Sequence, residues 1–368
     1  MGGSIQGAAP KASLVLQSML DSDDVNIRIP KDLTGLFEEA YSYGARISCN
    51  SWGASRPSYQ IPYDVGAWTV DNFICRKEDH VIVFAAGNDG EEMSHYSKMS
   101  QIGSTSAAKN SICVGATESR RPSIRLRYNP RGLIGHPDKI AYTSSRGPTF
   151  HKIIKPDVVA PGVAILRTCL RHEAMANRRE VFGQTDDDEW MFCSGTSMAA
   201  PLVLGCCVVL REALESKNKT ASPSAALVKA LLINGADDLK LPKPDEGFGR
   251  VNLKKSLRCV VESGPGEQVD WAQFGFEDVG GENALKDAYS DPPGENLQNN
   301  PILNVLIEQQ SGVAEEQRGD EGFVAENNVE QVKWDITSKI TAAIITFTAE
   351  RIAQLEGSQP FAVVWGIY

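Results

Sequence analysis

The sequence predicts an α/β domain built on a doubly wound parallel sheet, followed by a small antiparallel β domain. Short apolar runs alternate with helical patterns over the first 260 residues, and period-2 alternation takes over after Cys259. Alternating strands and helices are typical of βαβ units around a parallel sheet. We therefore expect a first domain at residues 1–260 and a second at residues 265–368.

The strands of the first domain are expected in short apolar runs that end at Gly, Asn, Asp or Ser. These runs are Ala12–Leu20, Ala45–Ser48, Val81–Ala86, Ile112–Ala116 and Val158–Val159. Helical spacing predicts helices over Leu33–Tyr43 and Tyr63–Arg76. A further helix is expected over Ala225–Asn234, where Ser222-Pro223-Ser224 supplies a capping serine and a first-turn proline.

The second domain is predicted from apolar residues that recur at every second position. They are Leu303, Val305 and Ile307, then Val332, Trp334 and Ile336, then Ile345, Phe347 and Ala349. Such alternation is typical of strands with one buried face. With Phe361–Tyr368 as a closing strand, the pattern predicts a small antiparallel β-sandwich or barrel.

Composition excludes some classes of partner. The 368 residues contain 37 basic and 47 acidic side chains, a net charge of −10, which argues against nucleic acid or an anionic membrane as the main partner. No set of His, Cys, Asp and Glu has metal-ligand spacing, and the acidic run 186–189 is better explained as a solvated charge run. The N-terminus shows no signal-peptide pattern.

A serine between a glycine turn and an apolar helix is the strongest chemical signal. Gly195-Thr196-Ser197 precedes Leu202–Leu210, a stretch apolar on every face that we expect to form a core helix too short to span a bilayer. Pro201 is expected in the first turn, where a missing N–H is tolerated. Ser197 would then lie at the positive end of the helix dipole, where N–H groups can meet an oxyanion.

A second signal is the apolar run that begins at Val81 and ends in the turn Gly87-Asn88-Asp89-Gly90. The Asn88 amide is a candidate donor to an oxyanion. An asparagine after a strand is more often only a turn residue, so the meaning of Asn88 depends on the motif around Ser197.

Taken together, these and other segments resemble the subtilisin-like serine proteases. The similarity covers residues 7–258 in the family's order. It is carried by Gly7–Ala12, Ser51–Gly53, Phe84–Gly90, Ala108–Ala116, Ser144–Pro148, Lys155–Gly162, Gly195–Pro201 and Gly247–Asn252. The C-terminal part resembles a β-sandwich that follows the catalytic domain in some longer members, through Asp291–Gly294, Asn327–Glu330 and Gln359–Val364.

The resemblance implies a serine endopeptidase in which Ser197 is the nucleophile. Asn88 and the Ser197 N–H would form the oxyanion hole, and loss of such an asparagine costs about 10²–10³ in rate in a member of this family. Cofactors are not expected, and calcium is implied by the family alone. The family also implies an extracellular location.

The same resemblance assigns substrate-binding residues. Ser51, Trp52 and Gly53 would pair with an extended peptide or protein substrate as an added strand. Ala85, Ala86 and Gly87 would line the S1 pocket. Neither nucleic acid nor membrane is expected as a partner.

Two parts of the family's triad are missing from this sequence. The family's aspartate lies in Asp-Ser/Thr-Gly and its histidine in His-Gly-Thr-His, both before the segment that matches Gly7–Ala12. Of five later histidines, only His95 is placed near the S1 rim, and a surface role suits it better. We therefore predict an N-terminally truncated subtilisin-like domain whose sheet is incomplete, and a chain that is inactive and marginally folded by itself.

Two other interpretations compete with a truncated protease. The first is a non-catalytic paralogue that binds protein or peptide through Ser51–Gly53 and the C-terminal domain. The second is an α/β-hydrolase esterase, which requires Gly two residues after the serine, where Ala199 stands. Such an enzyme also requires a histidine after the serine, and no histidine follows residue 172.

Overall fold

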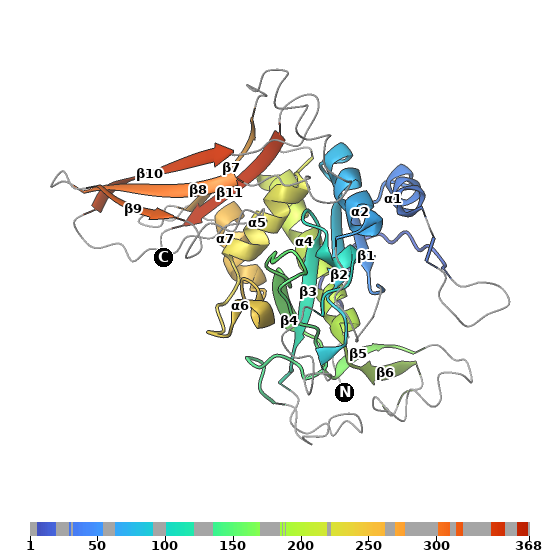
Figure 1. Cartoon of the computed structure of the whole chain (residues 1–368). Coiled ribbons are helices and arrows are strands. Elements are labelled where there is room, and N and C mark those ends of the chain that lie inside the picture. Colours follow the sequence, from blue (N-terminus) through green and yellow to red (C-terminus); the bar gives the residue numbers. More distant parts are fainter. Residues whose placement is uncertain are drawn as a thin grey trace.

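The chain folds around a parallel sheet in its first 260 residues and forms separate antiparallel strands after them (Figure 1). The computed structural model describes residues 6–19, 29–30, 32–53, 63–90, 101–120, 135–169, 185, 187, 189–218 and 222–261, together with five strands between residues 269 and 366.

The central sheet has the strand order β1-β2-β3-β4, and every neighbouring pair is parallel. Its strands are β1 (Ile47–Asn50), β2 (Val81–Ala85), β3 (Ile112–Thr117) and β4 (Val158–Pro161). The predicted parallel α/β sheet is therefore confirmed. The first of these strands begins two residues later than the expected run Ala45–Ser48.

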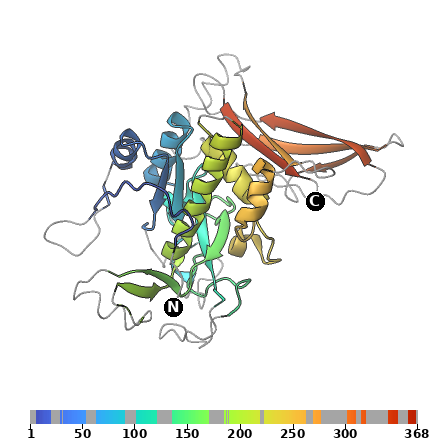
Figure 2. The same cartoon turned by 180° about the vertical axis from the view of Figure 1, so that it is seen from behind.

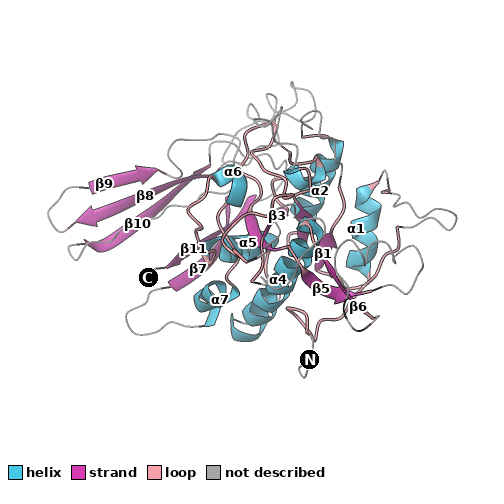
Figure 3. Cartoon of the chain, turned by 90° about the horizontal axis from the view of Figure 1, so that it is seen from below, coloured by secondary structure: helices cyan, strands magenta, loops and turns pink. Residues whose placement is uncertain are grey.

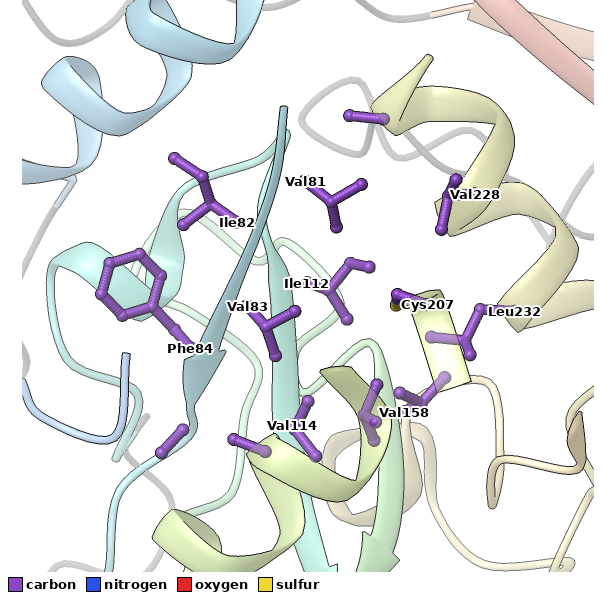
Figure 4. Close-up of a cluster of buried hydrophobic side chains, with 14 of the residues drawn as sticks. Val81, Ile82, Val83, Phe84, Ile112, Val114, Val158, Cys207, Val228 and Leu232 are labelled. Atoms are coloured by element: carbon purple, nitrogen blue, oxygen red, sulfur yellow. The ribbon is translucent and has the colours of Figure 1, made fainter. Parts of the chain in front are cut away.

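The sheet is buried on both faces, as parallel sheets usually are. All five residues of β2 are buried. Figure 4 shows Ile82 and Phe84 on one side of β2, while Val81 and Val83 point to the side occupied by Val228. One hydrophobic cluster joins both layers, so the apolar runs at β2, β3 and β4 form core strands.

Helices cover both faces of this sheet (Figure 2). They are α1 (Leu33–Ser42), α2 (Val65–Arg76), α4 (Thr196–Asn218), α5 (Ala225–Asn234), α6 (Lys243–Glu246) and α7 (Leu253–Val261), with a 3₁₀ turn η2 (Thr105–Ala107). The first two begin at aspartate caps, since the carboxylates of Asp32 and Asp64 accept backbone N–H groups of the first turn.

The helix after Gly195 is longer than the sequence predicted. α4 has 23 residues, and by length and composition alone the part from Thr196 to Ser216 could cross a membrane, so the expectation that it is too short was wrong. It packs along β1, β2, β3 and β4, which is the position of a core helix. Only one stripe is fully buried, including Val203, Cys207 and Leu210.

The start of α5 corrects a second detail. The helix spans Ala225–Asn234 as predicted, but its N-cap is Ser224, whose Oγ accepts a hydrogen bond from Leu227 N at 3.2 Å. Pro223 therefore lies before the cap and outside the first turn. The carbonyl oxygen of Pro223 accepts a hydrogen bond from Arg211 Nη1 at 3.1 Å, which ties this loop to α4.

The expected strand Ala12–Leu20 is wrong over its described residues. Residues 12–19 belong to no helix and to no strand of the described sheet. Leu14 and Leu16 are 77% and 87% exposed, so the apolar pattern does not correspond to burial here. A strand requires a hydrogen-bonded neighbour, and Gln17 instead donates through its side chain to Leu36 O at 3.0 Å.

Two short strands, β5 (Ile165–Thr168) and β6 (Trp190–Cys193), form an antiparallel pair just before Gly195. This pair brings the chain back to the Gly195 turn: Gly162 lies before β5, and its carbonyl oxygen accepts the N–H of Gly195 at 2.8 Å. The pair was not predicted from the sequence.

The described C-terminal strands are antiparallel (Figure 3). β8 (Pro301–Gln309) pairs with β9 (Ala314–Arg318) and β10 (Ile340–Ala349), and β7 (Val269–Phe276) pairs with β11 (Gln359–Gly366). The alternating runs at 303–307 and 345–349 are thus strands. The run Val332–Ile336 lies outside the described residues.

Candidate active site

Ser197 lies in the first turn of α4, directly after a glycine turn. Gly195 has a left-handed φ of 139°, and a β-carbon there would come within 3.1 Å of Asn88 Oδ1. A glycine is therefore needed where the two loops meet. The first N–H groups of a helix have no intrahelical partner, so Ser197 lies among backbone donors at a positive dipole end.

Ser51 and Ser197 contact each other reciprocally. Ser197 Oγ donates to Ser51 O at 3.3 Å, and Ser51 Oγ donates to Ser197 O at 3.0 Å. Pro201 explains why that carbonyl is available, because residue 201 would otherwise donate its N–H to Ser197 O. Pro201 thus lies in the second turn of α4, and the first-turn position expected from the sequence was wrong.

Asn88 is held beside Ser197 by the residue between Gly195 and the serine. Thr196 donates its N–H to Asn88 Oδ1 at 2.9 Å, and the single proton of its Oγ1 is shared between Asn88 Oδ1 at 3.2 Å and Gly87 O at 3.1 Å. With the amide oxygen occupied in this way, Nδ2 faces away from Thr196. Asn88 is exposed, and no described residue accepts a hydrogen bond from its Nδ2. An exposed, oriented amide donor next to a serine is suited to stabilising an oxyanion.

The three residues expected to bind substrate follow β1. Ser51 and Gly53 are exposed, whereas Trp52 is half-buried and packs edge-on against Phe84 with ring centroids 5.4 Å apart. β1 is an edge strand of the described sheet. The backbone after β1 is therefore anchored by an aromatic contact and leaves polar groups at the surface.

The residues expected to line the S1 pocket are more enclosed. Ala85 and Ala86 are 7% and 1% exposed. Ala85 O accepts Ser106 Oγ at 2.8 Å, while the N–H and carbonyl of Gly87 both hydrogen-bond with Thr196 Oγ1, at 3.2 Å and 3.1 Å. The structure thus brings Gly87 to the Ser197 turn and fixes Ala85 behind it.

No described histidine contacts Ser197. His80 is buried, and burial lowers its pKa to about 4, with Nε2 2.7 Å from Ser48 Oγ. His136 is exposed, and His151 packs against Phe150 with ring centroids 5.0 Å apart. His95 and His172 lie outside the described residues. None of the three described histidines is therefore placed to act as a base for Ser197.

The described residues contain no group of three or more His, Cys, Asp and Glu side chains placed to hold a metal ion. Asp186 and Asp188 of the acidic run lie outside them.

The contacts of Thr196 were not predicted from the sequence. Its side chain is fully buried and connects Asn88, Gly87 and the start of α4. The sequence did contain one sign of this role, namely that Thr196 directly precedes Ser197. A group that approaches Ser197 at the second position of α4 also comes close to the side chain at the first position.

The chain belongs to the subtilase family. The family profile described as Peptidase S8, subtilase family, matches residues 1–251. The predicted resemblance is therefore confirmed. This family consists of serine-type peptidases, which act on peptides and proteins.

Characterised relatives are similar over parts of their length. Pyrolysin from Pyrococcus furiosus is 30% identical over 277 residues, covering 70% of this chain and 18% of pyrolysin. Serine protease AprX from Bacillus subtilis is 30% identical over 178 residues, covering 48% of this chain and 35% of that protein. The serine protease/ABC transporter B family protein tagD from Dictyostelium discoideum is 26% identical, and the chain spans 16% of it.

Among solved structures, the patellamide maturation protease PatA is similar with a TM-score of 0.45 and 22% identity, covering 65% of this chain and 72% of that chain. The prenylagaramide maturation protease PagA has a TM-score of 0.44 and 21% identity, covering 64% and 69%.

Proposed function

We propose that the chain is the Ser197-bearing part of a subtilisin-like endopeptidase. Ser197 attacks the scissile carbonyl, and Asn88 Nδ2 with the Ser197 N–H stabilises the resulting oxyanion. The observation that carries this proposal is the hydrogen bond from Thr196 N–H to Asn88 Oδ1 at 2.9 Å, with the Thr196 hydroxyl 3.2 Å from the same oxygen. These contacts orient the amide so that its donor side is free.

The proposed substrate is an extended segment of a peptide or protein. It pairs with the exposed backbone after β1, at Ser51, Trp52 and Gly53, and its P1 side chain lies toward Ala85, Ala86 and Gly87. The edge position of β1 and the contact between Ser51 and Ser197 support this placement. As in the family, the proposed location is extracellular, and the acidic net charge favours protein over nucleic acid.

Two domains are proposed. Residues 1–260 form the subtilisin-like peptidase domain, and residues 265–368 form an antiparallel β-sandwich or barrel. The pairing of β8 with β9 and β10 supports the second domain. Calcium is not assigned to any residue.

Residues 1–368 by themselves are proposed to be hydrolytically inactive. A serine hydroxyl is a poor nucleophile without a base, and no described histidine contacts Ser197.

A fluorophosphonate probe tests this proposal, because it labels activated serines and its adduct is located by mass spectrometry. The 368-residue chain should label at Ser197 far more slowly than an intact subtilase, and Ser197→Ala should abolish the adduct. Rapid labelling of Ser197 would show that a base is present and would overturn the proposed inactivity. If labelling persisted in Ser197→Ala, the assignment of Ser197 as the nucleophile would be wrong.

The competing function is a non-catalytic paralogue that binds peptide along Ser51–Gly53. The described residues place no base beside Ser197, and this observation favours binding without cleavage. Titration of the chain with an extended peptide distinguishes the two functions. In the paralogue, Ser197→Ala and Asn88→Ala leave peptide affinity unchanged and no tetrahedral adduct forms on the wild-type chain.

A further inference from the structure

The turn that carries Asn88 is held by a second segment, Thr143–Ser145. The N–H of Gly90 donates to Thr143 O at 3.0 Å. Ser145 makes two bonds to this turn: its N–H donates to Gly87 O at 3.0 Å, and its Oγ accepts the N–H of Asp89 at 3.1 Å. Ser145 thus binds the residue before Asn88 and the residue after it.

The contact between Ser145 and the turn is close. Gly87 has a left-handed φ of 113°, and a β-carbon there would lie 2.6 Å from Ser145 Oγ. Ser145 is completely buried, while Asn88 is exposed. The serine therefore fixes the backbone from the inside and leaves the Asn88 side chain at the surface.

Asn88 is thus constrained from two sides that are far apart in the sequence. Thr196 binds the amide oxygen, and Ser145 binds the flanking backbone groups. If the backbone shifts, the amide nitrogen moves relative to Ser197 Oγ even when the bond to Thr196 persists. A displacement of about 1 Å is enough to reduce the stabilisation of a reacting centre substantially.

We propose that Ser145 is a positioning residue for the oxyanion donor Asn88. Its hydroxyl holds the Gly87–Gly90 turn so that Nδ2 points to the oxygen that becomes negative when Ser197 adds to a carbonyl. This inference rests on the proposed function, since it assumes that Asn88 is the oxyanion donor.

Binding of phenylboronic acid to the 368-residue chain tests the proposal without requiring turnover. A bond forms between Ser197 Oγ and boron, the hydroxyl proton passes to solvent, and the negative charge resides on the tetrahedral boronate. One boronate oxygen takes the place of the oxyanion. Titration followed by ¹¹B NMR gives the dissociation constant for each variant.

A double-mutant cycle separates positioning from general structural support. Ser145→Ala should weaken phenylboronic acid binding about fivefold, as expected for loss of one hydrogen bond. Asn88→Ala should weaken it about tenfold or more. Once Asn88 is alanine, the further change Ser145→Ala should have no effect on affinity, because the group that Ser145 positions is gone.

Ser111→Ala is the matched control. Ser111 is also completely buried and donates one hydrogen bond, from Oγ to Ala108 O at 3.1 Å, but it precedes β3 at the other end of the sheet. It should leave boronate affinity within twofold. If Ser145→Ala weakens binding equally in the Asn88→Ala background, the role of Ser145 is structural and the inference is wrong.

The failure of the inference is distinguishable from failure of the proposed function. If Asn88→Ala binds like the wild type, or the wild type forms no adduct, the proposed function fails. The side-chain ¹H–¹⁵N signals of Asn88, assigned with Asn88→Asp, then decide the role of Ser145: they should shift in Ser145→Ala, and unchanged signals overturn the inference. If Ser145→Ala does not fold, Ser145→Cys keeps the size with a weaker acceptor and should give an intermediate effect.

Discussion

The two ends of the parallel sheet differ in where their polar groups lie. At the carboxyl ends of β1 and β2, Ser51 and Asn88 are exposed. At the amino ends of β3 and β4, Lys155, Asp157 and Lys229 form a buried ionic cluster. One end of the sheet thus leaves polar groups exposed, while the other end holds charged groups inside the core.

The buried cluster is centred on Asp157. Its carboxylate oxygens lie 2.6 Å from Lys155 Nζ and 3.0 Å from Lys229 Nζ, and it also accepts the N–H of Cys113 at 2.7 Å. Burial alone would raise the pKa of Asp157, but the two ammonium groups hold it below its ordinary value. Burial lowers the pKa of Lys229 to about 8. We therefore expect mutations at the buried end to change mainly the stability of the chain, and mutations at the exposed end to change mainly binding.

The largest expected effect is at the buried end. Asp157→Ala leaves two buried ammonium groups without their shared partner and should lower the free energy of unfolding by about 3–5 kcal/mol. Urea unfolding followed by circular dichroism measures it. Asp138→Ala is the control, because Asp138 pairs with Arg250 at the surface with its side chain 67% exposed; a similar loss in both variants would contradict this account.

The next effect is a loss of stability in acid. His80, directly before β2, is fully buried, and burial lowers its pKa to about 4, below the ordinary value of about 6.5. The unfolded chain then binds more protons between these values, so stability is lost as the pH falls through this window, by about 3 kcal/mol.

Unfolding of the wild type and of His80→Gln at pH 7 and pH 4.5 measures this effect. The variant should lose less stability than the wild type over the same interval. His136→Gln changes an exposed histidine and should behave like the wild type. Equal losses in the wild type and in His80→Gln would count against a neutral, buried His80.

The smallest effect is at the exposed end. Ser51→Ala removes the hydrogen bond to Ser197 O and should lower the free energy of unfolding by about 1 kcal/mol. Urea unfolding measures it beside Ser42→Ala, which removes an exposed hydroxyl bonded to Glu39 O. If Ser51→Ala lowered the free energy of unfolding as much as Asp157→Ala does, the proposed difference between the two ends of the sheet would be wrong.

Much of the sheet was predictable because burial and local pattern agree there. Val81–Ala85 is continuously apolar and forms a central strand, and α5 spans the predicted Ala225–Asn234. Ala12–Leu20 carries a similar apolar pattern, yet its described residues form no strand. Periodicity records what a segment can bury and does not show whether a neighbouring strand is present.

Candidate site residues could be predicted from the sequence where a single short motif places them. Ser197 became a candidate from its own turn and Asn88 only together with the family resemblance, and the structure brings both to Thr196. The contact of Ser145 with the Asn88 turn was not predictable, because its two hydrogen bonds, to Gly87 and Asp89, join segments more than 50 positions apart in the sequence. Pro201 was misplaced by one turn for a related reason: its missing N–H is offset by Ser51, which lies on a different loop.

A crystal structure of the chain with phenylboronic acid tests the central claim most directly, namely that Ser197 and Asn88 form the nucleophile and oxyanion parts of one active site. We predict boron bonded to Ser197 Oγ, with one boronate oxygen at about 3 Å from Asn88 Nδ2. A boronate bound to another residue, or an adduct on Ser197 whose oxygens all point away from Asn88, would contradict the account.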